Sequence, residues 1–323
     1  MACLPVFVLL TLSLIISFSL VLGFTMDNNN SDDETTRPTL KPWSDRWRNK
    51  RIGFHLKDVN PVLVQHSSAL LPPAGTCEAS PEGPSVTRVF VPLCGKAIDM
   101  AYLATKTTAT ASVSPSDAVH VVGLEGIRVA LEEFIEEQPE LGISREPIPG
   151  TDGGGGGVPF ERFVGPTVAL WKGDYFDLGG SPSPPPAVAE ALGTFGAVYD
   201  RASMVAIEPD LRERYVRILD GLLDPGGRIL LVALERVASA GKEFAARKGP
   251  PYSVPEATVR ELFGGPGGGG GGGGGGGRYT IEILSQTDQL VEKPEDKERY
   301  PELEKLLETV YLIRKEATDG DAE

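Results

Sequence analysis

The sequence is poor in cysteine, histidine and basic residues, and each shortage excludes a class of function. Its three cysteines, Cys3, Cys77 and Cys94, form no C-x-x-C pair, so we expect neither a disulfide framework nor a cysteine-ligated metal site. The three histidines lack the spacing of metal ligands, and no metal is expected. Lys and Arg number 31 against 45 Asp and Glu, a net charge of −14, which argues against a nucleic-acid-binding groove.

The sequence also lacks the glycine-rich motifs that bind pyrophosphate. Residues 86–104 (VTRVFVPLCGKAIDMAYLA) read as an apolar strand, a tight turn and a helix, an order that points helix N–H groups at a ligand. The turn holds one glycine, Gly95, and matches neither G-x-G-x-x-G nor G-x-x-x-x-G-K-[ST]. A ligand with a ribose and an amino-acid carboxylate but no phosphate needs fewer glycines. The turn therefore favours S-adenosylmethionine (SAM) over NAD or ATP.

Charged residues stand where several predicted strands end. The apolar run 118–124 (AVHVVGL) leads into Glu125, and a carboxylate at the tip of the second strand of a βαβ unit can accept hydrogen bonds from a ribose. Asp174 and the Asp200-Arg201 pair follow other predicted strands. Because the carboxyl ends of parallel strands meet at one edge of a sheet, we expect one ligand site there. A buried βαβ unit with a chance glutamate is the alternative.

Strand-like and helix-like segments alternate along the chain, which indicates a layered α/β fold. The continuous apolar run 228–234 (RILLVAL) is typical of a parallel strand that is buried on both faces. Residues 158–164 and 167–171 predict a hairpin whose second arm is a core strand. Residues 294–308 are expected to form a charged helix before the last strand.

The N-terminus reads differently from the rest of the chain. Residues 1–24 are apolar and predict a signal peptide or a single membrane anchor, with secretory or organelle entry. Translation from Met26 would instead leave a cytoplasmic enzyme. Residues 25–41 are polar and acidic and predict a disordered linker. A helical lid is expected over 42–71 and the main domain over 85–316. Low-complexity insertions are expected within that domain at 105–117, 150–157 and 264–277.

Aromatic residues are concentrated in the expected lid. Trp43 and Trp47 are spaced i, i+4, so they share one face of a helix, and Phe54 follows after a break at Gly53. These side chains form either an aromatic cover over a bound cofactor or an apolar patch that packs the lid onto the domain.

Several segments together resemble one family. FVPLCGKAIDMAYLA, VVGLEG, GDYFDL, YDRASMVAIEPDLRERYV and VYLIRK, in this order between Trp43 and Lys315, are similar to the thiopurine S-methyltransferase family. The resemblance implies a class I methyltransferase with a Rossmann-like, seven-stranded, mostly parallel sheet. Its last strand would be antiparallel, with helices on both faces. It also implies transfer of a methyl group from SAM to a small aromatic or heterocyclic thiol.

The resemblance implies roles for individual residues. Seven are expected to bind the cofactor: Trp43, Phe54, Leu93, Gly95, Glu125, Asp174 and Tyr175. Phe54 is also expected to face the substrate, with Arg201 and, on a looser match, Arg299. Asp200 is assigned with Arg201 to the catalytic pair, as an orienting group more than as a base. Aromatic thiols ionise near neutral pH, so no dedicated base is required.

Two alternatives remain open at this stage. The same fold could methylate halide, bisulfide, selenium or tellurium species. A protein of another class could bind SAM without turnover, or bind NAD. Beyond a small-molecule substrate we expect no nucleic-acid partner, a membrane contact only through residues 1–24, and a monomer.

Overall fold

The computed structural model describes residues 31–71, 88–106, 119–151, 159–179, 184–264 and 279–317. The apolar leader 1–24 lies outside these residues, as does most of each expected insertion. Within the described segments, no helix is both long enough and apolar enough to span a membrane.

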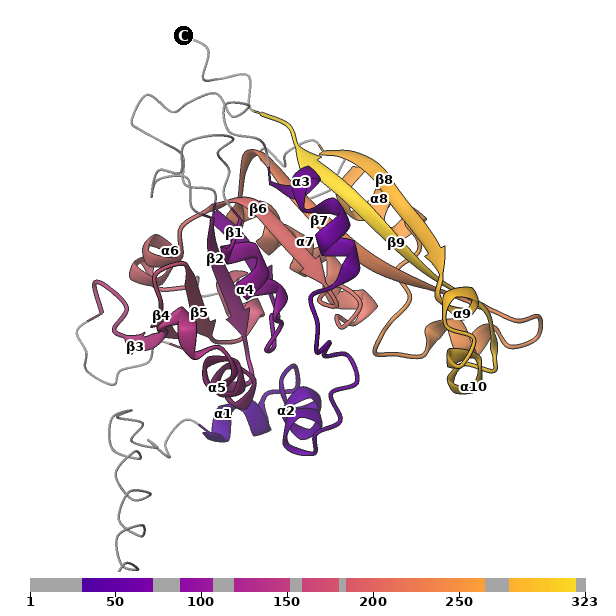
Figure 1. Ribbon diagram of the computed structural model, residues 1–323, viewed down its shortest axis with the longest axis horizontal. Helices are drawn as coiled ribbons and strands as arrows, with labels where there is room; N and C mark the ends of the chain where they lie inside the picture. Colours follow the sequence, from indigo (N-terminus) through magenta and orange to yellow (C-terminus); the bar gives the residue numbers. More distant parts are fainter. Residues whose placement is uncertain are drawn as a thin grey trace, which may run out of the picture.

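A single sheet forms the centre of the molecule (Figure 1). Its strand order is β3-β4-β5-β2-β1-β6-β7-β9-β8. The strands are β1 (Arg88–Pro92), β2 (His120–Glu125), β3 (Ser144–Glu146), β4 (Glu161–Val164), β5 (Val168–Lys172), β6 (Phe195–Arg201), β7 (Leu223–Ala238), β8 (Tyr279–Asp288) and β9 (Leu303–Lys315).

Helices pack on both faces of this sheet and along its carboxyl edge (Figure 1). They are α1 (Ser31–Thr36), α2 (Lys41–Arg48), α3 (Pro61–Leu70), α4 (Asp99–Ala104), α5 (Arg128–Glu137), α6 (Pro186–Leu192), α7 (Arg212–Leu222), α8 (Glu256–Gly264), α9 (Gln289–Glu292) and α10 (Asp296–Arg299).

The sheet confirms the class I methyltransferase fold and changes the strand count. Strands β5, β2, β1, β6 and β7 are parallel, and β9 runs antiparallel between β7 and β8. The sheet has nine strands rather than seven, because β4 pairs antiparallel with β5, as the predicted hairpin requires, and the short β3 pairs with β4. The unexpected β3 is fully exposed, so no apolar pattern marks it in the sequence.

Alternating side chains divide the core into two layers. Val89 and Val91 of β1 pack in a cluster with residues of α3, α4 and α5, such as Leu63. Phe90 between them packs in the opposite cluster with residues of α6, α7 and α8, such as Val216. Since successive side chains of a strand point to opposite faces, one strand of five residues supplies both layers.

The prediction of a charged helix over residues 294–308 is wrong. Only Asp296–Arg299 is helical, as α10, and β9 already begins at Leu303. Leu303 and Leu306 are buried beside Leu290, and the strand then pairs with β7 along its whole length. Burial and pairing with a long neighbouring strand outweigh the helix propensity of the glutamates and lysines here.

The prediction of a disordered linker over residues 25–41 is wrong for residues 31–41. They form α1 and the approach to α2, and three of their side chains bond to the domain. The buried Glu34 carboxylate accepts a hydrogen bond from the Arg128 N–H at 2.9 Å, and Arg37 pairs with Asp177. Because these contacts are made with distant residues, local composition does not reveal them.

Gly123 lies where β2 passes under the turn after β1, and it should tolerate no side chain. A Cβ atom there would lie 2.7 Å from both Cys94 Sγ and Met100 Sδ. We expect Gly123→Ala to lower the free energy of unfolding by about 1–3 kcal/mol, the usual cost of overpacking. Urea denaturation measures this. Gly196→Ala in β6 is the matched control, because nothing lies within 4 Å of its Cβ position, and equal losses in both variants contradict the prediction.

Candidate active site

A cavity of about 340 Å³ opens at the carboxyl edge of the sheet. Residues at the ends of β2, β1 and β6 form one wall, among them Glu125, Leu93 and Arg201. Helix α2 and the loop after it form the facing wall. Helix α3, the rest of the expected lid, packs on the sheet against β6, β7 and β9 instead. The volume is within the ~300–1,000 Å³ range of small-molecule sites.

Three residues that line this cavity have left-handed backbone conformations. Leu93 and Ala202, each following a strand, have φ of 45° and 68°, and Gly95 has φ of 54°. For side chains with a Cβ atom this conformation is strained, and such strain is concentrated at functional sites. At Gly95 a Cβ would also lie 3.2 Å from the Trp47 ring. A glycine is therefore required where the turn meets the aromatic wall.

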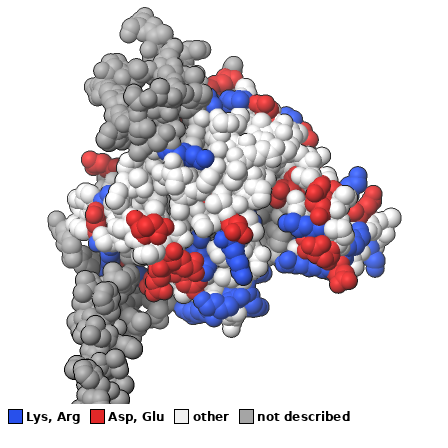
Figure 2. Space-filling model, in the orientation of Figure 1, with Lys and Arg blue, Asp and Glu red and all other residues white. Residues whose placement is uncertain are grey.

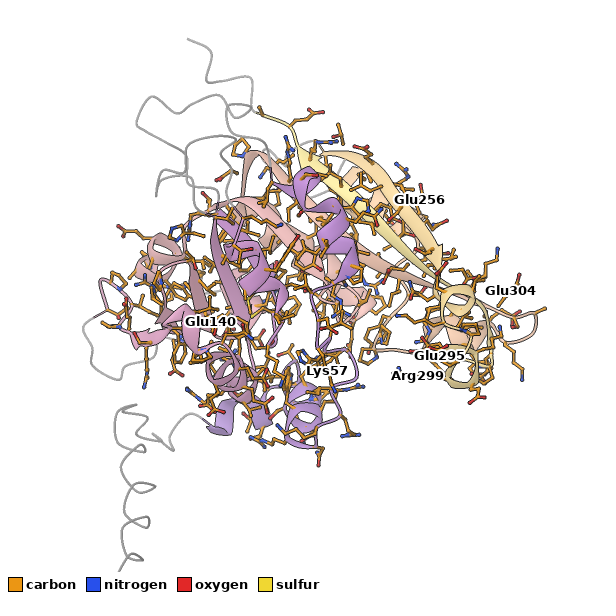
Figure 3. The ribbon with its side chains drawn as sticks, viewed as in Figure 1. Lys57, Glu140, Glu256, Glu295, Arg299 and Glu304 are labelled. Carbon is orange, nitrogen blue, oxygen red and sulfur yellow. The ribbon has the colours of Figure 1, made fainter. Side chains whose placement is uncertain are left out.

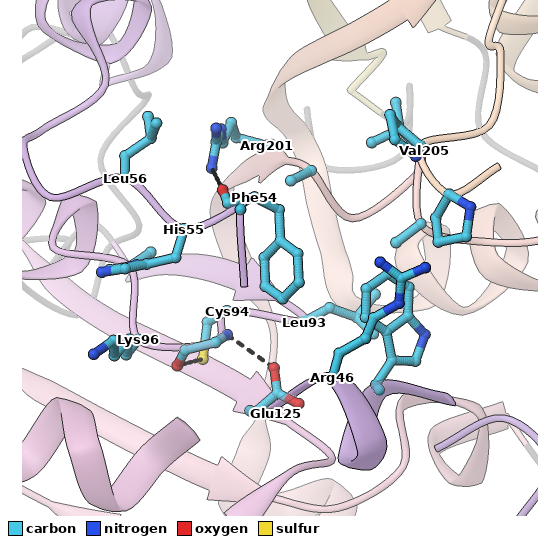
Figure 4. A pocket seen from close by; sticks show the side chains of 18 of the residues that line it. Arg46, Phe54, His55, Leu56, Leu93, Cys94, Lys96, Glu125, Arg201 and Val205 are labelled. Carbon is cyan, nitrogen blue, oxygen red and sulfur yellow. Dashed lines mark hydrogen bonds between the residues drawn. The ribbon is translucent and has the colours of Figure 1, made fainter. Parts of the chain in front are cut away.

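Glu125 joins the ends of β1 and β2. Its Oε2 accepts a hydrogen bond from the Gly95 N–H and its Oε1 from the Ile127 N–H, both at 2.8 Å (Figure 4). Each carboxylate oxygen can accept a second hydrogen bond. The side chain lines the cavity, so it can receive both hydroxyls of a ribose, as the sequence predicts.

Cys94 lies in the same turn and is buried. Burial, followed by the charge of Glu125, raises the pKa of its thiol well above the usual value. Because a thiol reacts as the thiolate, this buried cysteine is a packing residue rather than a nucleophile.

Asp174 and Tyr175 were expected beside the cofactor, and the structure separates them. Asp174 lines the cavity, where Oδ2 accepts from Thr39 Oγ1 at 2.6 Å and Oδ1 from the Phe176 N–H at 3.0 Å. Tyr175 does not line the cavity; its hydroxyl donates to the Tyr215 carbonyl inside the core. The 3₁₀ turn after β5 directs Tyr175 inward and places Phe176 against the cavity.

Aromatic rings from the α2 region cover the cavity. Phe54 contacts Trp43 and Trp47 edge to face, with ring centroids 5.6 and 5.9 Å apart. The Phe54 ring points into the cavity between Arg201 and Leu93 (Figure 4). Its carbonyl accepts a hydrogen bond from Arg201 Nη1 at 2.8 Å, which ties the loop after α2 to β6. One apolar wall therefore faces both the end of the cavity at Glu125 and the end at Arg201.

Arg201 lies near two carboxylates that the sequence reasoning did not select, Asp99 and Glu308. Both line the cavity, and Arg201 lowers the pKa of each, although burial has the larger, opposite effect. Asp99 accepts hydrogen bonds from the Asn60 N–H at 2.8 Å and the Tyr199 hydroxyl at 3.2 Å. The end of the cavity around Arg201, called the substrate half below, thus holds the Arg201 guanidinium and two carboxylates. The end around Glu125 and Asp174 is called the cofactor half.

Asp200 was assigned to the catalytic pair as an orienting group for Arg201 and the neighbouring backbone; the structure shows it bonded to the backbone and to Tyr215, and not to Arg201. Its side chain is completely buried and does not line the cavity. It accepts from the Tyr215 hydroxyl at 2.7 Å and the Met204 N–H at 3.1 Å. Successive side chains of β6 face opposite ways, so Arg201 points to the cavity and Asp200 into the core. Asp200 stabilises the turn after β6.

Arg299 and a basic patch lie at the rim of the cavity. Arg299, exposed at the end of α10, lines the cavity beside Tyr300 (Figure 3). Basic residues gather over α2 and its following turn in a chain that is acidic overall (Figure 2). They are Lys41, Arg46, Arg48, Lys50 and Arg51. Such a rim attracts anions to the entrance.

Several polar and aromatic residues of this cavity are not among those that the sequence predicts, notably Thr39, Asp99, Phe176 and Glu308. Thr39 stands in the expected linker and Glu308 in the expected charged helix, and neither kind of segment suggests a ligand site. Asp99, one residue after Ile98 at the start of α4, was available as a signal, because a carboxylate there lies one turn from Gly95.

Glu125 should make the stability of the ligand-free protein fall as the pH rises. Burial raises its pKa to about 7, although the backbone N–H groups of Ile127, Gly95 and Gly126 oppose this. The unfolded chain loses this proton near its usual, lower pKa, so between pH 5 and 8 the folded state retains a proton that the unfolded state releases. We expect the wild type to lose about 3 kcal/mol more than Glu125→Gln over this range.

Urea unfolding at each pH measures this difference. The exposed Glu140→Gln is the control and should keep the wild-type slope (Figure 3). Parallel slopes for the wild type and Glu125→Gln would contradict the raised pKa.

Comparison with known proteins identifies the family. The family model described as thiopurine S-methyltransferase matches residues 39–316. The thiopurine S-methyltransferase of Methylococcus capsulatus is 32% identical over 276 residues, covering 85% of this chain and 97% of the relative. That of Pseudomonas entomophila is 35% identical over 223 residues, covering 69% of this chain and 82% of the relative.

Among solved structures, phosphoethanolamine N-methyltransferase 2 of Haemonchus contortus has a TM-score of 0.48 at 10% identity and covers 88% of this chain and 59% of that chain. An arsenic(III) S-adenosylmethionine methyltransferase of Chlamydomonas reinhardtii has a TM-score of 0.43 at 16% identity, covering 76% and 68%. The family match extends over most of the chain and includes every strand of the sheet. The chain therefore belongs to the thiopurine S-methyltransferase family and is a SAM-dependent methyltransferase.

Proposed function

We propose that this cavity binds SAM, the cofactor of this enzyme, and that different residues hold its different parts. The Glu125 carboxylate can accept from the ribose hydroxyls, and Asp174 and Phe176 lie at the neighbouring strand end for the adenine. The turn after β1, with Leu93 and Gly95, lines the cavity between the cofactor half and the substrate half. When bound, SAM supplies an electrophilic methyl group on a sulfonium.

We propose that the methyl acceptor is the sulfur of a small aromatic or heterocyclic thiol, of which thiopurines are one type. The observation that carries this proposal is the Phe54 ring, which points into the substrate half of the cavity beside the Arg201 guanidinium (Figure 4). An aromatic ring offers a stacking or edge contact to a flat substrate. The curated relatives, named thiopurine S-methyltransferases, support the same substrate class.

The enzyme's own residues contribute positioning and charge. The aromatic cover of Trp43, Trp47 and Phe54 excludes water from the reacting sulfur and holds a flat substrate in line with the methyl group. The Arg201 guanidinium, held by the Phe54 carbonyl, stabilises negative charge on that sulfur.

The aromatic wall argues against inorganic anions as the main substrates. A halide or bisulfide ion is small and offers no flat surface for the rings of Trp43, Trp47 and Phe54 to contact.

The first experiment is calorimetric titration with SAM and NADH, followed by a methyl-transfer assay with thiophenol, 6-mercaptopurine and iodide. We expect binding of SAM alone and turnover of both thiols. We expect Glu125→Gln to weaken SAM binding about 10–100-fold, because it disrupts charge-assisted hydrogen bonds, with Glu140→Gln as control. SAM binding with turnover of iodide but not of thiols would refute the proposed substrate.

Phe54→Ala should weaken substrate binding and leave the fold intact. The loss of a buried ring contact predicts an increase of about tenfold or more in the KM for thiophenol. Steady-state kinetics at saturating SAM measure it. Phe244→Ala is the matched control, because Phe244 is 49% exposed and does not line the cavity. An unchanged KM in Phe54→Ala would show that the ring does not contact the substrate.

A further inference from the structure

A glutamate at the substrate end of the cavity has no role in the chemistry described so far. Glu308 lies on β9 opposite Leu234 of β7, while Arg201 of β6 lies opposite Val232. Because Val232 and Leu234 are two residues apart, Arg201 and Glu308 share one face of the sheet. Both line the cavity.

The hydrogen bonds of Glu308 leave one of its oxygens available. Oε1 accepts from Gln289 Nε2 at 3.2 Å, and Oε2 has no hydrogen-bond partner among the described residues. Asp99, the other carboxylate, differs because both of its oxygens already accept hydrogen bonds, from Asn60 and Tyr199. Of the two carboxylates, Glu308 is therefore the one with an oxygen that accepts no hydrogen bond from the described residues.

The surroundings of Glu308 suit a proton acceptor. Burial raises the pKa of its carboxyl group, opposed by Arg201 on β6 and by Lys293 after α9. Tyr199 also faces it from β6, and Gln289 from α9. A carboxylate whose pKa is closer to neutral is a better base at physiological pH.

We propose that Glu308 is the general base for those thiol substrates that enter the site still protonated; acidic aromatic thiols, already ionised, do not need it. The inference rests on the proposed thiol substrate. The S–H bond breaks and its proton moves to Oε2 of Glu308, leaving the electron pair on sulfur. The thiolate forms a bond to the methyl carbon, and the electron pair of the broken sulfur–methyl bond stays on the donor. Glu308 then releases its proton to water.

This transfer leaves the charge of the substrate half unchanged. Before it, Arg201 faces the Glu308 carboxylate; after it, Arg201 faces the thiolate and Glu308 is neutral. Negative charge thus moves from carboxylate to sulfur while the same guanidinium compensates it, which limits the cost in a partly buried site. The role of Arg201 is then electrostatic, and that of Glu308 is proton transfer.

His55 is the competing base, and its orientation is less suitable. Burial is the main cause that lowers the pKa of its imidazole, and Lys96 adds to this. Figure 4 shows its ring directed toward Lys96, whereas the ring of the neighbouring Phe54 points into the middle of the cavity.

The test is the pH dependence of kcat/KM for thiols of different acidity. With a weakly acidic thiol such as benzyl mercaptan, we expect the wild type to reach a plateau near neutral pH, because Glu308 takes the proton. Glu308→Gln should be about 10²-fold slower on this plateau and should rise tenfold per pH unit, since it depends on thiolate from solution. With 4-nitrothiophenol, which is already ionised, the variant should lose less than threefold.

The controls distinguish catalysis from folding. Glu304→Gln lies on the same strand but is exposed, and it should match the wild type with both thiols (Figure 3). Calorimetry should give the same SAM affinity for Glu308→Gln and wild type, and Glu308→Asp should restore part of the plateau.

Each remaining outcome overturns the proposal. Equal losses with both thiols would assign Glu308 a positioning role through Gln289. An unchanged profile in Glu308→Gln, or loss of the plateau in His55→Gln instead, would exclude Glu308 as the base. If the wild type binds SAM but methylates neither thiol, the proposed substrate fails first and the inference fails with it.

Discussion

The Glu125 carboxylate, held by two backbone N–H groups, is the contact on which the geometry of the active site depends. It fixes the left-handed turn at Gly95 against the start of α5, and this turn supports Trp47 on its outer side. Burial makes the charged form of Glu125 costly before a ligand arrives. A ligand that donates two hydroxyl groups to the carboxylate offsets this desolvation cost. The buried carboxylate therefore favours a ribose-like ligand.

The substrate half depends on a different residue, the Arg201 guanidinium. It holds the loop after α2 through the Phe54 carbonyl and compensates two carboxylates from α4 and β9. Orientation of the aromatic wall and charge compensation are therefore coupled. A change that releases Arg201 from Phe54 would alter both the shape of the cavity and the ionisation of the groups around it. In the proposed reaction, this coupling lets one arginine serve a substrate that loses a proton on the way to methyl transfer.

The sequence brings Leu93, Gly95 and Glu125 to one cavity because these residues are local. Leu93, Gly95 and Glu125 follow from one βαβ unit and from the convergence of parallel strand ends. The errors arise where the prediction needs the direction of a side chain. Tyr175 and Asp200 stand next to residues that do face the cavity, yet turn into the core. Residues 31–41 have the composition of a linker, but distant partners order them. The position of Glu308 beside the cavity depends on the register between β7 and β9, which no short motif encodes.

The different origins of the two halves have a consequence for specificity. In the proposed assignment the ribose is bound at Glu125, which its bond from the Gly95 N–H joins to the turn after β1, so few substitutions there leave β1 and β2 undisturbed. The proposed substrate contacts come from the loop after α2 and from β6 and β9, brought together only by the fold. Substitutions at exposed positions of the rim, such as Arg299, cost little stability. On this assignment the acceptor can change through substitutions around Arg201, Glu308 and the rim while the methyl donor stays the same.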